Sequence, residues 1–173
     1  MANDPSWRIR EYRAGDEAAC RACVVELQDS ERQIDPRLRP GEEMADEYWE
    51  AMRAQCDAYA GTVLMAEVGG AVAGLVLILT RVPAEALDEP PGEHALVAEL
   101  VVRTRWRGRG IGAALLTAAE ERARAAGASE LRISVLSGNA VARRLYRSRG
   151  FARYLETLAK PLRPDGGAEQ TTD

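Results

Sequence analysis

Apolar and polar positions in the first half of the chain repeat with two periods, those of strands and of helices. The predicted elements are a strand at 7–12, helices at 16–30 and 42–58, and strands at 62–68 and 71–80. Asp16 is expected to cap the first helix, because its carboxylate can accept a bond from a first-turn amide. Gly69 and Gly70 separate the two later strands and predict a hairpin turn. Tyr48, Trp49 and Met52 recur at helical spacing, which favours a stripe of core residues.

The second half alternates strands with helices. The predicted elements are strands at 96–102, 131–136 and 151–158, and helices at 110–126 and 139–149. The first of these strands is apolar except for Glu99, so it is expected to lie centrally in a sheet. The helix at 110–126 is rich in alanine and can pack closely on that sheet, and Gly127 is expected to end it. Residues 163–173 are polar and glycine-rich and are expected to be a disordered tail, so that residues 1–162 form a single domain.

Composition and charge narrow the class of protein. The chain has 173 residues, of which 46% are apolar, as in an ordinary globular domain. Its formal net charge of −4 argues against a nucleic-acid partner. No apolar run is long enough to span a bilayer, and the N-terminal residues lack the apolar stretch of a signal peptide. We therefore expect a cytoplasmic protein with no membrane partner.

The three cysteines do not indicate a metal or disulfide framework. Cys20 and Cys23 have the spacing of a redox pair, but they lie in a predicted helix with no zinc-ligand partners nearby. The chain has one histidine, His94. Buried helix thiols are therefore favoured for Cys20 and Cys23, no metal site is expected, and the lack of a disulfide pattern suits a reducing compartment.

The segment from Arg107 to Gly112 reads Arg-Gly-Arg-Gly-Ile-Gly and stands between a predicted strand and a predicted helix. Glycines let the backbone approach an anion closely, and the first amides of a helix have no intrahelical acceptor. This order predicts a phosphate-binding turn. A P-loop is excluded, since no lysine follows the glycines, and the dinucleotide fingerprint fails because the glycine spacing is one residue too short. The pattern that does fit is R-x-x-G-x-G.

A second motif follows about thirty residues later. Asn139, Arg143 and Tyr146 are spaced i, i+4 and i+7, which places all three on one helical face. Gly150 and Phe151 follow, giving N-x-x-A-x-x-L-Y-x-x-x-G-F. In this order and at this separation, the two motifs resemble the GNAT superfamily of acyl-CoA-dependent N-acetyltransferases. The resemblance extends from about residue 96 to residue 151, whereas the N-terminal half matches only in its coarse pattern.

The resemblance implies an α/β (α+β) fold with a mixed, mostly antiparallel sheet, helices on both faces and splayed central strands. It implies acetyl-CoA as cosubstrate, without a metal, and with the pantetheine arm inserted beside the central strand. The cofactor-binding residues it implies are Leu100, Val101, Val102, Arg107, Gly108, Arg109, Gly110, Ile111, Gly112, Ala113, Asn139, Arg143 and Tyr146. In this context the arginines at 103, 105, 107 and 109 are interpreted as a collar for the CoA phosphates.

The activity implied is direct attack of a primary amine on the thioester in a ternary complex. Tyr146 matches the position of the acid that protonates the leaving thiolate, and the Val102 amide is a candidate donor to the oxyanion. Glu99, a carboxylate in an apolar strand, is the candidate base, with substrate binding or a water chain as alternatives. His94 could also serve as a base, although its place beside a proline- and glycine-rich loop favours a surface histidine. The acceptor is expected to be a small-molecule amine, with a protein amine and a homodimer left open. A CoA-binding module without catalysis and a dinucleotide-dependent oxidoreductase remain as other classes.

Overall fold

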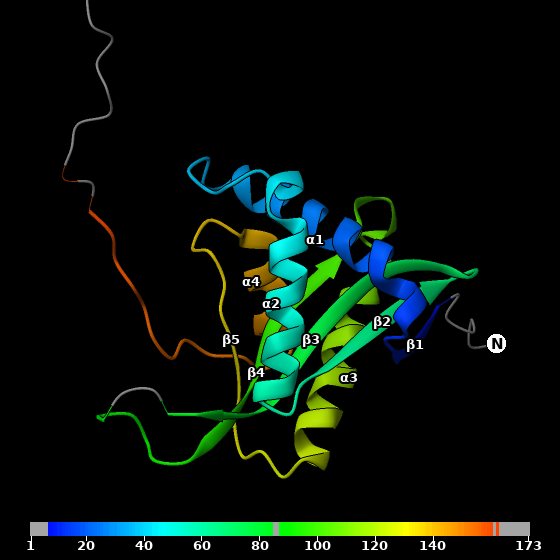
Figure 1. Ribbon diagram of the computed structural model, residues 1–173. Coiled ribbons are helices and arrows are strands. Elements are labelled where there is room, and N and C mark those ends of the chain that lie inside the picture. Colours follow the sequence, from blue (N-terminus) through cyan, green and yellow to red (C-terminus); the bar gives the residue numbers. More distant parts are fainter. Residues whose placement is uncertain (1–6, 85–86, 161, 163–173) are drawn as a thin grey trace, which may run out of the picture.

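The computed structural model describes residues 7–84, 87–160 and 162, and its centre is a five-stranded sheet in the order β1-β2-β3-β4-β5 (Figure 1). The strands are β1 (Arg8–Glu11), β2 (Thr62–Val68), β3 (Ala71–Pro83), β4 (Glu93–Val102) and β5 (Leu131–Ile133). Strands β1 to β4 pair in antiparallel fashion, and β5 pairs in parallel with β4. The expected mixed, mostly antiparallel sheet is confirmed.

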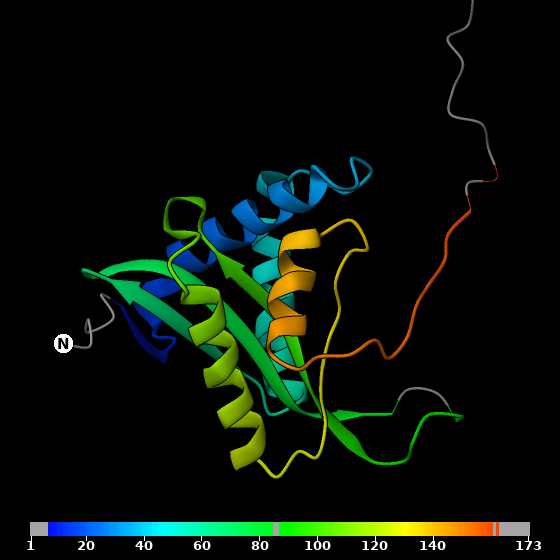
Figure 2. The same ribbon diagram turned by 180° about the vertical axis from the view of Figure 1, so that it is seen from behind.

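Two layers of helices cover the sheet, one on each face (Figures 1 and 2). The helices are α1 (Glu17–Arg32), α2 (Ala45–Ala58), α3 (Ile111–Ala125) and α4 (Ala140–Ser148). Helices α1 and α2 bury Cys20, Cys23, Trp49 and Met52 against one face, whereas α3 and α4 pack on the other. Strand β3 is covered on both sides, which explains why its sequence is a nearly continuous apolar run rather than an alternating one.

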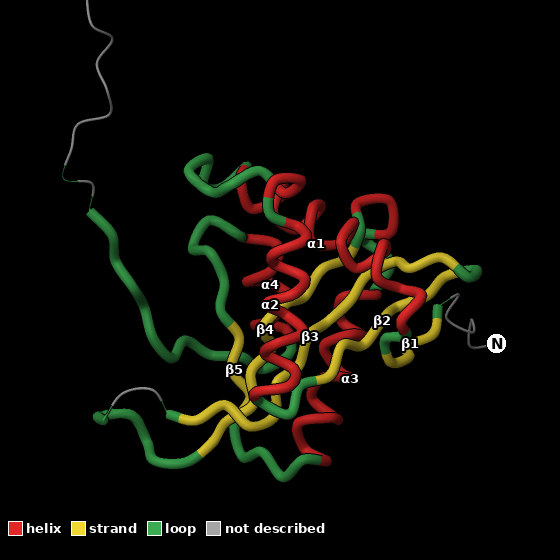
Figure 3. The backbone as a smooth tube through the Cα atoms, viewed as in Figure 1, coloured by secondary structure: helices red, strands yellow, loops and turns green. Residues whose placement is uncertain are grey.

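The hairpin predicted at Gly69 and Gly70 joins β2 to β3, and both glycines have positive φ. The backbone trace shows β3 and β4 as the long central strands of the sheet (Figure 3). The expected core stripe in α2 is confirmed for Trp49 and Met52, which are 0% and 2% exposed. Cys20 and Cys23 are also fully buried, and burial raises the pKa of each thiol to about 12, so neither resembles a reactive redox cysteine.

Three local predictions need correction. The side chain of Asp16 does not cap α1; it accepts bonds from the Arg13 amide and from the Arg10 guanidinium, which hold it beside β1. The second helix begins at Ala45, after a 3-10 turn, η2 (Gly41–Glu43). Residues 151–158 were expected to form the last strand, but they are in no strand, and β5 ends at Ile133.

The absence of that strand has a structural reason. Phe151 turns back onto α4, where its amide donates to the carbonyl of Tyr146 at 3.1 Å. Beyond it, residues 152–160 are exposed, and the contact of this segment with β5 is a stacked pair, the Arg132 guanidinium 4.4 Å from the ring centroid of Tyr154. A strand exists only where a partner strand supplies a hydrogen-bond ladder, and here none does. The predicted tail at 163–173 lies outside the described residues.

Candidate active site

A β-bulge in β4 decides which way Glu99 points. Leu77 pairs with Glu99 and Ile78 pairs with Val97, so Ala98 is an extra residue on β4. Strict alternation would have put Glu99 on the same face as Val97, toward α3 and α4. The extra residue turns Glu99 to the other face, where the hydroxyl of Tyr48 on α2 donates a hydrogen bond to its Oε1. Beyond the bulge, Leu100 and Val102 face the α3/α4 side and Val101 faces the α1/α2 side.

The carboxyl of Glu99 lies in an environment that favours its neutral form. Burial raises its pKa to about 7, from an ordinary value of 4.5, and the nearby Glu31 on α1 adds to this rise. The hydrogen bond from Tyr48 acts in the opposite direction, because it stabilises the carboxylate. Burial, together with the charge of Glu99, raises the pKa of Tyr48, so that this phenol stays protonated and remains a donor. Glu99 can therefore change its protonation state near neutral pH.

The β5 side of β4 is open next to Glu99. Strand β5 pairs only with Ala95 to Val97, so the rest of β4 has no partner on that side among the described residues. On the opposite side the Arg103 amide donates to the Ala73 carbonyl at 2.9 Å. Backbone groups of successive residues point to opposite sides in an antiparallel pair, so the Val102 amide points toward the opening. This is the splayed geometry expected for the central strands.

A glycine turn connects β4 to α3 at the same end of the sheet. The chain passes through a 3-10 turn, η3 (Thr104–Trp106), and then Gly108 and Gly110 adopt φ values of +75° and +83°. The first helical bond of α3 runs from the Ala114 amide to the Gly110 carbonyl, at 3.1 Å, so the amides of residues 111–113 have no intrahelical acceptor. No side chain caps them. The backbone thus forms a cradle with the positive end of the α3 dipole at its floor.

The glycines at this turn also bring three elements together. A Cβ at Gly112 would lie 3.4 Å from Leu145 Cδ2 on α4 and 3.5 Å from Val102 Cγ2 on β4, which is ordinary van der Waals contact, so the turn, α4 and β4 adjoin at this position. A Cβ at Gly108 would meet no atom within 4 Å, which leaves the outer side of the turn open. The cradle therefore has a packed base and an accessible mouth, a geometry that can admit an anionic group.

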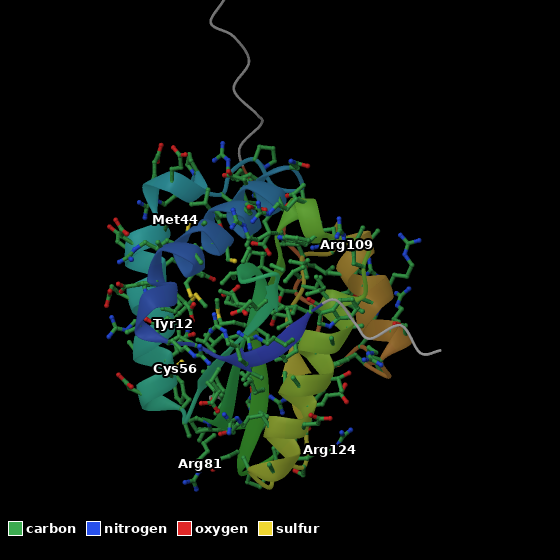
Figure 4. The ribbon with its side chains drawn as sticks, turned by 90° about the vertical axis from the view of Figure 1, so that its right-hand side faces the viewer. Tyr12, Met44, Cys56, Arg81, Arg109 and Arg124 are labelled. Carbon is green, nitrogen blue, oxygen red and sulfur yellow. The ribbon has the colours of Figure 1, made fainter. Side chains whose placement is uncertain are left out.

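The arginines around the turn have distinct partners. Arg107 donates from Nε to the Val102 carbonyl and from Nη2 to Ser30 Oγ, both at 2.9 Å, so its side chain ties the turn to β4 and α1. Arg103 pairs with Glu26 at 2.8 Å. Arg105 and Arg109 stack on the ring of Trp106, with Arg109 4.8 Å from its centroid, and both are exposed. Figure 4 shows Arg109 at the cradle end of α3 and Arg124 near the opposite end.

Helix α4 supplies the second predicted motif. Asn139 is its N-cap and accepts from the Ala142 amide at 3.0 Å, and Arg143 donates to the Ser137 carbonyl at 2.8 Å. Arg149 donates from Nη2 to the Ala113 carbonyl at 2.9 Å, which ties the end of α4 to the first turn of α3. The two motifs, separated in sequence, therefore form adjoining walls of one site.

Tyr146 is 9% exposed and packs against Phe151, with ring centroids 6.0 Å apart. Burial raises its pKa to about 12, and the charges of Glu31 and Glu99 contribute, so its phenol is protonated at neutral pH. Among the described residues, Trp106 Nε1 is the only fully buried side-chain nitrogen or oxygen without a partner. No hydrogen-bond partner of the Tyr146 hydroxyl is found among the described residues, so this hydroxyl is not fully enclosed.

Comparison with known proteins identifies the family. The sequence profile described as the acetyltransferase (GNAT) family matches residues 24–151. The chain belongs to this GNAT acetyltransferase family. The match includes β4, the glycine turn and α4, and it extends into the N-terminal half, where the motifs gave no specific signal.

Solved structures show the same GNAT fold. A tetramutant of the BH1408 protein from Bacillus halodurans has a TM-score of 0.76 at 20% identity, over 90% of this chain and 99% of that chain. Aminoglycoside N-acetyltransferase AAC(6')-Iy in complex with CoA has a TM-score of 0.63 at 16% identity, over 91% and 100%. A predicted acetyltransferase with acetyl-CoA from Clostridium acetobutylicum has a TM-score of 0.67 at 15% identity, over 90% and 96%. No curated protein matches the sequence.

One contact of this GNAT site was not predicted from the sequence. Tyr48 was interpreted as a core residue, but its hydroxyl reaches Glu99, 51 positions later in the chain. The available signal was a polar-tipped ring on an apolar helix face, since a buried tyrosine hydroxyl usually finds a partner.

His94 lies at the other end of β4 from the glycine turn. Within the described part of the chain, no helix is long and apolar enough to cross a membrane.

Proposed function

We propose that this GNAT acetyltransferase transfers an acetyl group from acetyl-CoA to the primary amine of a small molecule, by direct attack in a ternary complex. The observation that carries the proposal is the combination at one end of the sheet: an open backbone edge on β4, a glycine cradle at the α3 N-terminus, and a half-buried Glu99 facing the α1/α2 layer. The cradle can bind a phosphate group, the open edge of β4 can pair with an extended arm, and the Glu99 carboxyl can bind an amine.

The residues present fit acetyl-CoA, which supplies an activated acetyl thioester when bound. The unpaired amides of residues 111–113 and the two positive-φ glycines, Gly108 and Gly110, would hold its pyrophosphate. The exposed guanidinium of Arg109 stands beside this turn and adds positive charge. The outward-facing backbone of Leu100 would pair with its amide-containing arm, next to Val102, whose carbonyl accepts from Arg107.

Three groups then divide the chemistry. An alkylammonium has a pKa of about 10.4 and must lose a proton before it can attack. Glu99, with a pKa of about 7, holds the ammonium by charge and accepts its proton directly or through water. The Val102 amide faces the developing oxyanion, Tyr146 donates a proton to the departing thiolate, and the second proton lost by the acetylated nitrogen restores the Tyr146 phenol.

A small amine is favoured as acceptor because Glu99 is half-buried and its carboxyl faces Tyr48 in the α1/α2 layer. The similar structure of AAC(6')-Iy has been solved with a bisubstrate analogue that joins CoA to an acetylated aminoglycoside fragment. That structure supports a cationic small-molecule acceptor for this chain also. A protein amine would have to insert a flexible lysine between the helices to reach the same carboxyl.

Two measurements test the proposal. Acetyl-CoA and desulfo-CoA should both raise the melting temperature, because both carry a pyrophosphate for the cradle and an amide-containing arm for the open edge of β4. NAD has a pyrophosphate but no such arm, so it should raise the melting temperature much less. A panel of primary amines, assayed by release of free CoA thiol, should then contain acceptors that turn over. No stabilisation by either CoA compound at millimolar concentration contradicts the cofactor site. Stabilisation without turnover of any amine, including lysine peptides, favours a CoA-binding module instead.

A further inference from the structure

The hydrogen bond between Tyr48 and Glu99 joins α2 to the central strand at the proposed base. Tyr48 is followed directly by Trp49, which is fully buried, and Met52 lies one turn later and is 2% exposed. These anchors fix the helix, so the phenol of Tyr48 has a defined position over β4. The tyrosine hydroxyl is the one hydrogen-bond donor to the Glu99 carboxyl among the described residues.

We propose that Tyr48 is a positioning residue for catalysis: its hydroxyl donates to the Glu99 carboxylate, orients it and stabilises its charged form. This inference rests on the proposed role of Glu99 as the base. Tyr48 acts on the reaction only through the Glu99 carboxylate, without contacting acetyl-CoA or the amine itself.

The groups facing Glu99 explain why a donor is needed there. Glu31 approaches from α1 and disfavours the charged form of Glu99, as burial also does. Tyr146 on α4 responds to the charge of Glu99 and is a neutral phenol. Against this environment the Tyr48 hydroxyl is the group that lowers the pKa of Glu99. Without it, a larger fraction of the Glu99 carboxyl would be protonated at neutral pH, and only the ionised remainder could accept a proton from the ammonium.

Tyr48→Phe tests the inference because it removes the hydroxyl and keeps the ring. Carbon NMR of the ligand-free protein, labelled at glutamate side-chain carboxyls, would follow each carboxyl with pH, and the Glu99 signal is the one missing from Glu99→Gln. We expect the Glu99 pKa to rise by about one unit in Tyr48→Phe, the effect of losing a hydrogen bond to a charged group. Tyr12→Phe is the matched control. Tyr12 packs against the same core cluster as Tyr48, and its ring centroid lies 5.3 Å from that of Trp49.

Kinetics give a second readout. In Tyr48→Phe the acidic limb of the kcat/KM profile should move to higher pH, with a loss of roughly fivefold at pH 7 that approaches tenfold at lower pH and recovers at higher pH. In a Glu99→Gln background the Tyr48→Phe change should leave the profile unaltered. A merely structural role for Tyr48 would lower the melting temperature and shift neither the NMR titration nor the kinetic limb.

The outcomes separate this inference from the proposed function. An unchanged Glu99 titration in Tyr48→Phe overturns the role of Tyr48, whatever the enzyme acetylates. A raised Glu99 pKa, combined with full turnover in Glu99→Gln, would instead overturn Glu99 as the base, and with it the catalytic meaning of the contact. A raised pKa together with the displaced kinetic limb supports both.

Discussion

Replacing Glu99 by glutamine should make the protein more stable at pH 8 and leave its stability nearly unchanged at low pH. The folded-state pKa of Glu99 is raised to about 7, against an ordinary value of 4.5. Below pH 4.5 the carboxyl is protonated in both states and costs nothing. As the pH rises toward 7, the unfolded chain releases this proton while the folded protein retains it, so the folded state loses relative stability.

This loss is complete once the pH exceeds about 7. At about 1.4 kcal/mol for each tenfold change in proton affinity, it amounts to about 3 kcal/mol at pH 8 and less than about 1 kcal/mol at pH 5. Glutamine cannot ionise, and its carbonyl oxygen can still accept the hydrogen bond from Tyr48. For a chain of this length, about 3 kcal/mol corresponds to an increase in melting temperature of roughly 6–12 °C.

Urea unfolding of wild type and Glu99→Gln, each at pH 5 and pH 8, measures this difference. Glu42→Gln is the matched control, because Glu42 is exposed and the same change of charge is made at the surface. We expect the advantage of Glu99→Gln to grow by about 2–3 kcal/mol between the two pH values, and the control to show no comparable change. An advantage that is the same at both pH values would refute the reasoning, because it would mean that Glu99 titrates alike in the folded and unfolded states.

Three further predictions concern the cradle, the acid and the sheet. Gly110→Asp should abolish stabilisation by acetyl-CoA in a protein that still folds, whereas Gly127→Asp, which imposes a similar strain at φ +81° at the other end of α3, should retain it in the same melting assay. Tyr146→Phe should lower kcat by roughly one to three decades with little change in CoA affinity, and steady-state rates equal to those of the control Tyr59→Phe would exclude Tyr146 as the acid. Gly74→Ala should cost roughly 1–3 kcal/mol in urea unfolding, because its Cβ would collide with the Val101 carbonyl oxygen, and unchanged stability would show that β4 yields easily at this point.

Several features of this protein were determined by local sequence. The strand–glycine–helix order from Arg107 to Gly112 formed the expected turn, because positive φ values at Gly108 and Gly110 are a short-range property of residues without a side chain. Helix α4 formed at Ala140–Ser148, close to the predicted 139–149, with Asn139 as its N-cap, because an asparagine side chain can accept from a first-turn amide. The hairpin at Gly69 and Gly70 formed for the same kind of reason.

The tertiary structure decided the features that depend on pairing between distant segments. The face on which Glu99 lies was set by the bulge at Ala98, and a bulge depends on how β4 aligns with β3. The last strand, predicted at residues 151–158, did not form. A strand needs hydrogen bonds to a neighbouring strand, and the apolar pattern of a segment does not determine whether it pairs with β5.

The contact between Tyr48 and Glu99 shows the same limit most directly. Each residue could be placed on its own element from the sequence, one on a helix and one on a strand. Their meeting depends on how α2 packs over the sheet and on the one-residue register of β4. Packing and register arise from the whole core. The sequence therefore predicted the element on which each of the two residues lies, whereas only the tertiary structure decided that they pair.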